Sequence, residues 1–216
     1  AAAQDPSSRD NLLALARGGA ASVKPLREAL EAQPTVSKAK ALCLLGDPAG
    51  VPLLASWIEK ASVTNGPAYD WEGFLNVPEL DGAMWVAAIP RDRRATAALV
   101  GKLNQCQSDT GFNTLRTVTL ALGRIGDPQA AAALAAFLRK PGVRGHCDTG
   151  KDPASVEAAQ FSKAMVELFA ASSLYRCGDA DGLGRSILTA YLEDWRGIFV
   201  RYAGYVLAEK PSPAAR

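Results

Sequence analysis

Apolar residues recur at helical spacing along most of the chain, in runs that stop and restart with almost no polar segment between them. In LGRIGDPQAAAALAAFLRK (residues 122–140), one run ends at Gly126 and the next begins directly after Asp127 and Pro128. Glycine closes a last helical turn in the left-handed conformation, aspartate caps the free amides of a following helix, and proline suits the first helical position. The stretch therefore predicts a helical hairpin with almost no loop.

The same turn occurs at two other places, as Gly46, Asp47 and Pro48 and, without the proline, as Gly178 and Asp179. When the copies at Gly46 and Gly126 are aligned without a gap, residues of similar size and polarity fall at matching positions with helical spacing. The matched pairs are Leu45 with Ile125, Val51 with Ala131, Leu54 with Leu134, Trp57 with Phe137, and Ile58 with Leu138. The third copy needs two extra residues after its turn. We interpret the three copies as an internal repeat.

Three further segments extend this repeat. Residues 87–103 fit as another unit if Ile89 stands for Ile125, although this unit lacks the glycine turn. Residues 11–32 read as two short helices broken at a glycine pair, and residues 195–210 read as one closing helix. With about 40 residues per unit, the predicted fold class is all-α: an α-solenoid of about five stacked helical hairpins with a terminal capping helix.

The succession of helix, Leu-Gly-Asp-Pro turn and second helix in LLGDPAGVPLLASWI resembles the HEAT family, particularly the short bacterial type known from phycobilisome-lyase-like repeats. The resemblance covers residues 11–209, which we expect to form a single HEAT-like repeat domain. We expect a flexible, processed N-terminus over residues 1–10 and a C-terminal tail over residues 210–216. The resemblance implies a curved stack of helices that holds other proteins.

The unit TLALGRIGDPQAAAALAAFL and the closing DWRGIFVRYAGYVL are also similar to repeats in the C-terminal part of certain bacterial FAD-dependent oxidoreductases. This likeness implies an alternative, in which the chain is an accessory domain or subunit of such an enzyme complex. In GDADGLGRS, the glycines follow a helix and not a strand, and the third glycine of the dinucleotide fingerprint is missing. We therefore expect no cofactor in this chain.

Composition agrees with a folded helical domain, with 48% hydrophobic and 21% charged residues. No apolar run approaches the ~18 residues of a membrane span, so we expect no membrane insertion. The net charge of +2 is too small to indicate a polyanionic partner, and we expect no binding to nucleic acid. We interpret Arg91, Arg93, Arg94 and Lys102 as the solvated face of one helix.

Three inserts, residues 61–78, 105–112 and 140–155, break the repeat length between units and not inside the hairpin turns. They should gather on one edge of the stack, where insertions often build a binding surface. The first insert carries aromatic and acidic residues that would suit a partner contact: Tyr69, Asp70, Trp71, Glu72 and Phe74. The alternative is that this insert folds down and its aromatic rings cover the ends of neighbouring helices.

The four cysteines fall into two pairs. Cys43 and Cys177 lie in apolar runs just before hairpin turns and are expected to be buried packing residues. Cys106 and Cys147 lie in polar inserts that should meet on the same edge, so a disulfide between them is feasible, with two free thiols as the alternative. Such a disulfide would indicate an oxidising compartment.

The sequence begins with AAAQDPSS and no methionine. Small residues of this kind remain after cleavage at an Ala-x-Ala signal-peptide site, so we expect a periplasmic or extracellular protein. The alternative is a piece of a longer protein, located in the cytoplasm.

Candidate catalytic and metal-binding residues do not form a convincing pattern. His146, Cys147 and Asp148 are adjacent and fit no zinc spacing, and a Cys-His nucleophile pair fails for the same reason. Asp70 and Glu72, together with Glu79 or Asp81, would need a cleft to act as the acid and base of a glycosidase. We therefore predict no metal site and a non-catalytic scaffold that binds another protein through its concave face and its inter-repeat loop edge.

Overall fold

A computed structural model describes residues 18–63, 79–150, 158–179 and 181–209 of the chain. Within these residues the chain forms ten α-helices and no β-strand, so the predicted all-α class is confirmed. The helices are α2 (Val23–Ala32), α3 (Val36–Leu44), α4 (Val51–Lys60), α5 (Glu79–Ala87), α6 (Thr96–Gln105), α7 (Phe112–Ile125), α8 (Ala131–Leu138), α9 (Ala158–Arg176), α10 (Leu183–Ala190) and α11 (Gly197–Ala208). None of these helices combines the length and hydrophobicity that a bilayer span requires.

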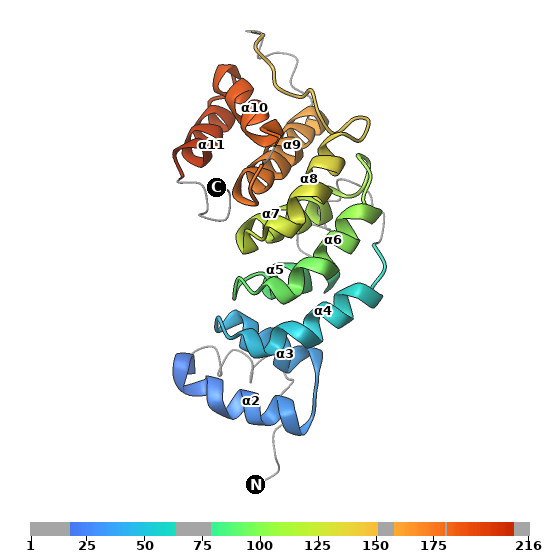
Figure 1. The fold of residues 1–216 in the computed structure, drawn as a ribbon, viewed down its shortest axis with the longest axis vertical. Helices are drawn as coiled ribbons and strands as arrows, with labels where there is room; N and C mark the ends of the chain where they lie inside the picture. Colours follow the sequence, from blue (N-terminus) through green and yellow to red (C-terminus); the bar gives the residue numbers. More distant parts are fainter. Residues whose placement is uncertain (1–17, 64–78, 151–157, 180, 210–216) are drawn as a thin grey trace.

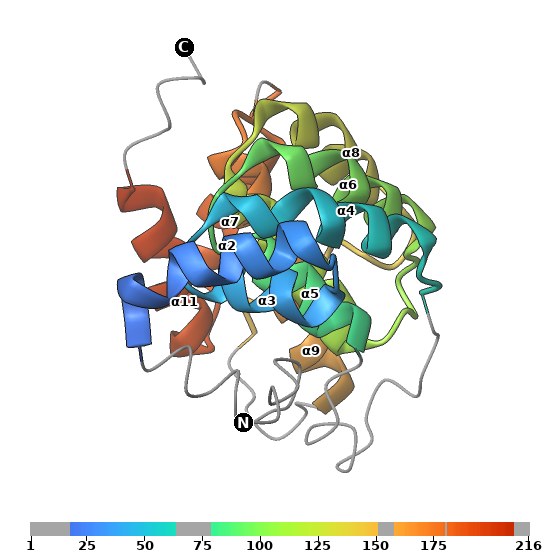
Figure 2. The same cartoon turned by 90° about the horizontal axis from the view of Figure 1, so that it is seen from below.

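Short turns join successive helices into hairpins, α3 with α4, α5 with α6, α7 with α8, and α9 with α10 (Figure 1). Helices α3, α5, α7 and α9 pack on one another in one layer, and α4, α6 and α8 form a second layer beside them (Figure 2). Helix α2 packs on α3 at one end, and α11 packs on α9 and α10 at the other (Figure 1). The described residues thus form an α-solenoid of four complete hairpins, flanked by α2 and by the predicted closing helix.

The core runs continuously between the two layers, and its repeat follows the hairpin turns. In the first three hairpins, a fully buried leucine lies seven residues after the turn aspartate, and another large buried aliphatic residue lies eleven residues after it. These positions are Leu54, Leu99 and Leu134, and Ile58, Leu103 and Leu138. The apolar register predicted from the sequence is therefore the register in which these hairpins bury their side chains.

The turns are built by glycine and aspartate. Gly46 and Gly126 have φ angles of +80° and +68°, the left-handed conformation that ends a helix. Asp47 accepts a hydrogen bond from the amide of Ala49 at 2.9 Å, and Asp127 accepts one from Gln129. Pro48 and Pro128 each begin the 3-10 turn that leads into the next helix.

The turn between α9 and α10 differs because two extra residues follow it. Gly178 is again left-handed, with φ +109°. Asp179 accepts hydrogen bonds from the amides of Gly184 (2.8 Å) and Arg185 (2.7 Å), which belong to the first turn of α10. Asp179 therefore still caps the N-terminus of α10, although two more residues separate it from that helix.

The turn between α5 and α6 corrects the sequence alignment. Arg91 takes the left-handed position, with φ +57°, and Asp92 accepts a hydrogen bond from the amide of Arg94 at 2.9 Å. Pro90, and not Ile89, therefore stands where Ile125 stands in the other unit. The placement of Ile89 was wrong by one residue, because this unit has no glycine to mark the turn and places an arginine in the left-handed conformation before the capping aspartate.

Lys102 also contradicts the sequence interpretation, because its side chain is only 2% exposed. Its ammonium group donates hydrogen bonds to the carbonyl oxygens of Glu59 and Ala61, at the C-terminal end of α4. Lys140 binds the carbonyls of Asn104 and Cys106 at the end of α6 in the same way. A lysine from the next unit thus satisfies carbonyls that the helix itself leaves unpaired and complements the negative end of its dipole.

The stack bends toward the edge that carries the hairpin turns. On that side α2 and α11 extend beyond α3, α5 and α7, while the inter-repeat connections lie on the opposite, convex side (Figure 1). The concave side and the inter-repeat loop edge are therefore two separate surfaces of the molecule.

Candidate functional site

Tyr69, Asp70, Trp71, Glu72 and Phe74 lie outside the described residues. Their assignment to a partner contact stays a prediction.

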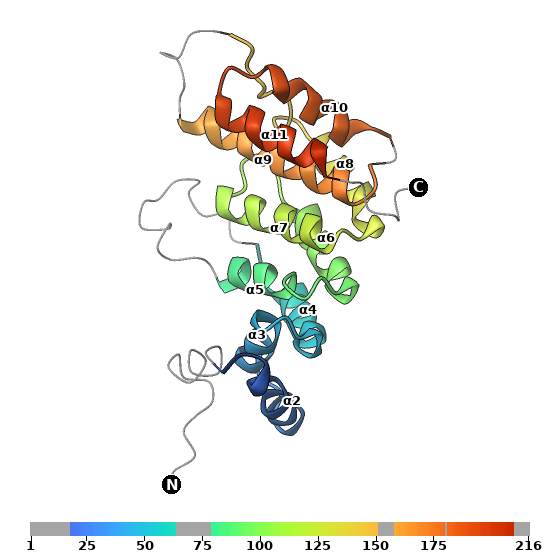
Figure 3. The same cartoon turned by 90° about the vertical axis from the view of Figure 1, so that its left-hand side faces the viewer.

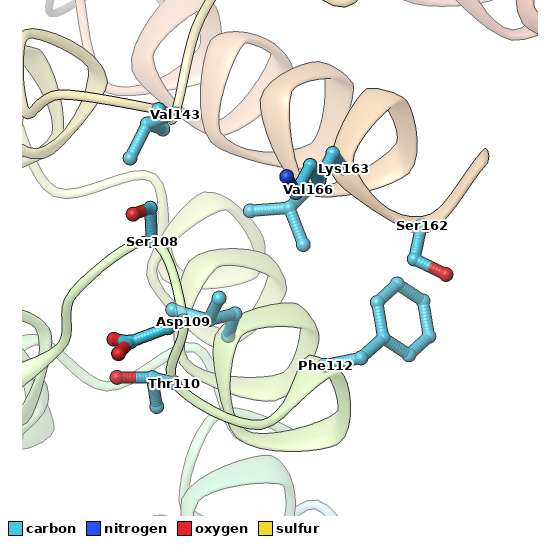
Figure 4. Close-up of a pocket in the computed structure, with 10 residues that line it drawn as sticks. Ser108, Asp109, Thr110, Phe112, Val143, Ser162, Lys163 and Val166 are labelled. Atoms are coloured by element: carbon cyan, nitrogen blue, oxygen red, sulfur yellow. The ribbon is translucent and has the colours of Figure 1, made fainter. Parts of the chain in front are cut away.

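The other two inserts meet on the loop edge and enclose a pocket of about 260 Å³ (Figure 4). One wall is the connection between α6 and α7, the second is the connection between α8 and α9, and α9 itself forms the third. The apolar part of the lining is Phe112, Leu115, Val143 and Val166. Polar groups at the pocket include Ser108, Asp109 and Lys163. The predicted gathering of inserts on one edge is thus seen for these two connections.

The wall between α6 and α7 is a tight turn. Gln107 donates its amide hydrogen to the Thr110 hydroxyl at 2.8 Å, and Thr110 donates its own amide hydrogen to the Gln107 carbonyl. Gly142 of the opposite wall lies so close that a Cβ at this position would be 3.1 Å from Ser108 Oγ. Because Gly142 also has φ +76°, a side chain would be disfavoured there for two reasons.

The wall between α8 and α9 is held by Glu167, a residue of α9 with 3% exposure. Its carboxylate accepts hydrogen bonds from the amides of Gly145 (3.1 Å) and His146 (2.9 Å) and from the hydroxyl of Tyr191 (2.9 Å). Tyr191 is fully buried, and burial together with the neighbouring carboxylate raises the pKa of its phenol. One buried acidic group therefore fixes a loop, α9 and the segment after α10 together.

A second buried pair holds the same loop from the C-terminal side. Asp194 accepts hydrogen bonds from the Arg196 guanidinium and, at 2.9 Å, from the amide of Asp148. Arg196 donates in turn to the carbonyl of His146 at 2.7 Å. Burial would raise the pKa of Asp194, but the hydrogen bonds from Arg196 and Asp148 hold that pKa below its ordinary value. The pocket wall is therefore rigidly supported.

The adjacent residues considered as metal ligands or as a nucleophile pair have separate structural contacts. The His146 ring bonds to the carbonyl of Gly142 at 3.0 Å, and Cys147 donates to the carbonyl of Ala190 at 3.3 Å. Asp148 accepts a hydrogen bond from the Trp195 indole at 3.0 Å. Across the described ranges, no three His, Cys, Asp or Glu side chains converge as a metal-binding group.

The disulfide considered for Cys106 and Cys147 is absent, and both are free thiols in this structure. Cys106 is not a loop residue facing the edge, because it caps α6 and its buried thiol donates to the Lys102 carbonyl at 3.3 Å. Burial raises the pKa of both thiols to about 11. Cys43 and Cys177 are buried, as expected, with pKa values of about 12 for the same reason. The cysteines therefore lend no support to an oxidising compartment.

Asp81, considered above as a catalytic carboxylate, is buried in α5 with 1% exposure. Oδ2 accepts a hydrogen bond from the Thr114 hydroxyl at 3.2 Å, whereas Oδ1 has no partner. Burial raises the pKa of this carboxyl group. Its ionised form is therefore disfavoured in the folded protein.

We expect Asp81→Asn to raise the free energy of unfolding at pH 7 relative to the native protein, and to lose this advantage as the pH falls. Because the folded pKa lies above the unfolded one, the native state binds more protons between the two values, and the penalty of Asp81 grows as pH rises through that window. Urea unfolding at several pH values between about 3 and 7 measures this, with the exposed Asp109→Asn as control. A stability difference independent of pH would contradict the assignment.

Sequence reasoning missed the residues that build this pocket wall. Glu167 lies in the apolar run MVELFAASSL, where a single charged residue inside a buried helix was the available signal. Asp194 and Arg196 lie before the closing helix and gave no pattern of their own. Their partners come from a loop about 50 residues earlier and could not be inferred from local spacing.

Comparison with known proteins agrees with this geometry. A family model described as PBS lyase HEAT-like repeat matches residues 115–140, which cover most of α7 and all of α8. No curated protein and no solved structure matches the chain. The hairpin before the matched unit has the same capping aspartate and the same two buried positions, Leu99 and Leu103. One unit of the chain is thus similar to the PBS lyase HEAT-like repeat, and the described residues have the fold of an all-α solenoid.

Proposed function

We propose that this protein is a non-catalytic scaffold that binds another protein, with the inter-repeat loop edge and the concave side as its contact surfaces. The observation that carries the proposal is the preformed apolar pocket on the loop edge. A rigid apolar pocket lets a partner side chain be buried without first ordering the receptor, which is the arrangement found at interface hot spots.

The size and lining of the pocket favour a protein partner. Its volume of about 260 Å³ lies below the ~300–1,000 Å³ range of small-molecule sites and suits one or two amino-acid side chains. Neither cysteine nor histidine lines it, and the polar groups at its rim form no nucleophile and base pair. Binding, and not chemistry, is therefore the role that these residues support.

The proposal is tested by photo-crosslinking in the cells that make the protein. A benzoylphenylalanine at the exposed rim position Lys163 should crosslink to one dominant protein. The same group at Arg201, exposed on α11 away from the pocket, should not. Ser108→Phe, which fills the rim of the pocket, should reduce the crosslink at least fivefold, whereas the matched Ser186→Phe on the surface of α10 should leave it unchanged.

Two results would contradict the proposal. One is an absence of any crosslinked protein specific to position 163, and the other is a crosslink that Ser108→Phe does not affect. The identity of the captured protein also separates the two hypotheses, because a flavoprotein would favour an accessory role in an oxidoreductase complex.

A further inference from the structure

A second groove lies on the concave side, about 390 Å³ in volume, between the ends of α5, α7, α9 and α11. Figure 3 faces this edge and shows α5, α7 and α9 following one another along the stack, with α11 in front of α9. The side chains that decide its chemistry are Trp85, Arg91, Leu120, Arg124, Arg176 and Glu209. No residue of the loop-edge pocket contributes to it.

The groove has an excess of positive charge, with three arginines against one glutamate. Arg176 and Glu209 pair with each other through two hydrogen bonds, both 2.8 Å long. Among the described residues, neither Arg91 nor Arg124 forms an ion pair with a carboxylate. Two guanidinium groups at the groove are therefore not neutralised from within the described chain.

Arg91 holds its position at a conformational cost. Within the described part of the chain, it is the only non-glycine residue with positive φ, and the other hairpins have glycine at this place. The left-handed conformation costs an L-residue such as arginine about 1 kcal/mol. Strain of this kind concentrates at binding and active sites. A glycine would make the turn more easily, so the arginine supplies something other than the turn.

Trp85 supplies the apolar wall. Its side chain is 42% exposed, although tryptophan is highly buried on average in folded proteins. The Arg124 guanidinium carbon lies 5.8 Å from the centre of the indole ring, so the ring holds this arginine at the groove. Exposed tryptophan and arginine side by side are the residue types that dominate binding energy at protein interfaces.

We propose that this groove binds an acidic segment of a partner protein, with carboxylates paired to Arg91 and Arg124 and an apolar side chain packed against Trp85 and Leu120. The inference rests on the proposed scaffold function and names the chemistry of the partner at the concave side. Guanidinium groups pair with carboxylates in bidentate geometry, and such pairs give an interface specificity and orientation. A chain with a net charge of only +2 argues against a nucleic-acid backbone as the occupant.

The test is a phage library of random dodecapeptides, selected in parallel on the native protein and on the double variant Arg91→Glu/Arg124→Glu. The matched control is Arg144→Glu/Arg185→Glu, which makes the same charge change at exposed positions outside the groove. Circular dichroism and urea unfolding show whether each variant is folded. Selected peptides are then labelled with fluorescein and measured by anisotropy, together with a labelled 20-base-pair DNA duplex.

Peptides selected on the native protein and on the control should be enriched in Asp and Glu beside Leu or an aromatic residue. Charge reversal in the groove should weaken their binding at least tenfold, and the control should change it less than twofold. No acidic enrichment, an enrichment that charge reversal leaves intact, or DNA binding with the same sensitivity would overturn the proposal. Because this assay uses peptides alone, its outcome is independent of the crosslinking at Lys163.

Discussion

Glu167→Ala is expected to lower the free energy of unfolding by about 3–5 kcal/mol. The substitution removes the shared acceptor of three hydrogen bonds, from the amides of Gly145 and His146 and from the hydroxyl of Tyr191. Tyr191 is fully buried, so its hydroxyl would be left without a partner, and water cannot reach it without opening the core. The loop that forms one wall of the edge pocket would lose its anchor at the same time.

Guanidinium unfolding monitored by circular dichroism measures the loss of stability, and hydrogen exchange at residues 143–148 measures the release of the loop. Glu167→Gln is the conservative variant, because its carbonyl oxygen still accepts from one or two donors, and a smaller loss of about 1–3 kcal/mol is expected. Double substitution with Tyr191→Phe should cost less than the sum of the single effects, since the two groups share one bond. Full additivity would show that Glu167 and Tyr191 act independently.

Gly123→Ala is expected to destabilise the protein by about 2–3 kcal/mol, although alanine is the better helix former. Gly123 lies in α7 where this helix packs on α9. A Cβ at this position would lie 2.8 Å from the Cβ and 2.9 Å from the Cα of Ser173. Both distances are shorter than the contacts that real Cβ atoms make. The Ser173 Cα is a backbone atom and its Cβ is bonded to the backbone, so neither can move aside unless α9 moves. Helices α7 and α9 would therefore have to separate, although they form the most extensive helix contact in the described stack.

Gly101→Ala is the matched control, because Gly101 is also inside a helix but nothing lies within 4 Å of an added Cβ. There alanine should raise the free energy of unfolding by about 0.5–1 kcal/mol. Ser173→Gly should restore part of the stability of Gly123→Ala by removing the facing side chain, whose hydroxyl has no hydrogen-bond partner. If Gly123→Ala were as stable as Gly101→Ala, the close packing of α7 on α9 would be wrong.

Local sequence determined the repeat. Gly46, Asp47 and Pro48, and the copy at residue 126, contain within three residues the groups that end one helix and begin the next, because capping is a contact between near neighbours. The apolar register that follows, as in Leu54 and Leu134, depends only on the helical period and on burial of one face. The hairpins and their buried positions therefore follow from the local sequence.

Tertiary structure decided which polar side chains are buried and where the pocket and the groove form. Lys102 became buried because α4 ends beside it, and Cys106 turned inward at the end of α6. Glu167 anchors the loop between α8 and α9 because α9 packs beside that loop and places the carboxylate within hydrogen-bond distance of the Gly145 amide. The partners of Lys102 and Glu167 lie on other elements, more than 20 residues away, so local periodicity carries no record of these contacts. The pocket and the groove are products of stacking, whereas the hairpins that stack are products of the sequence.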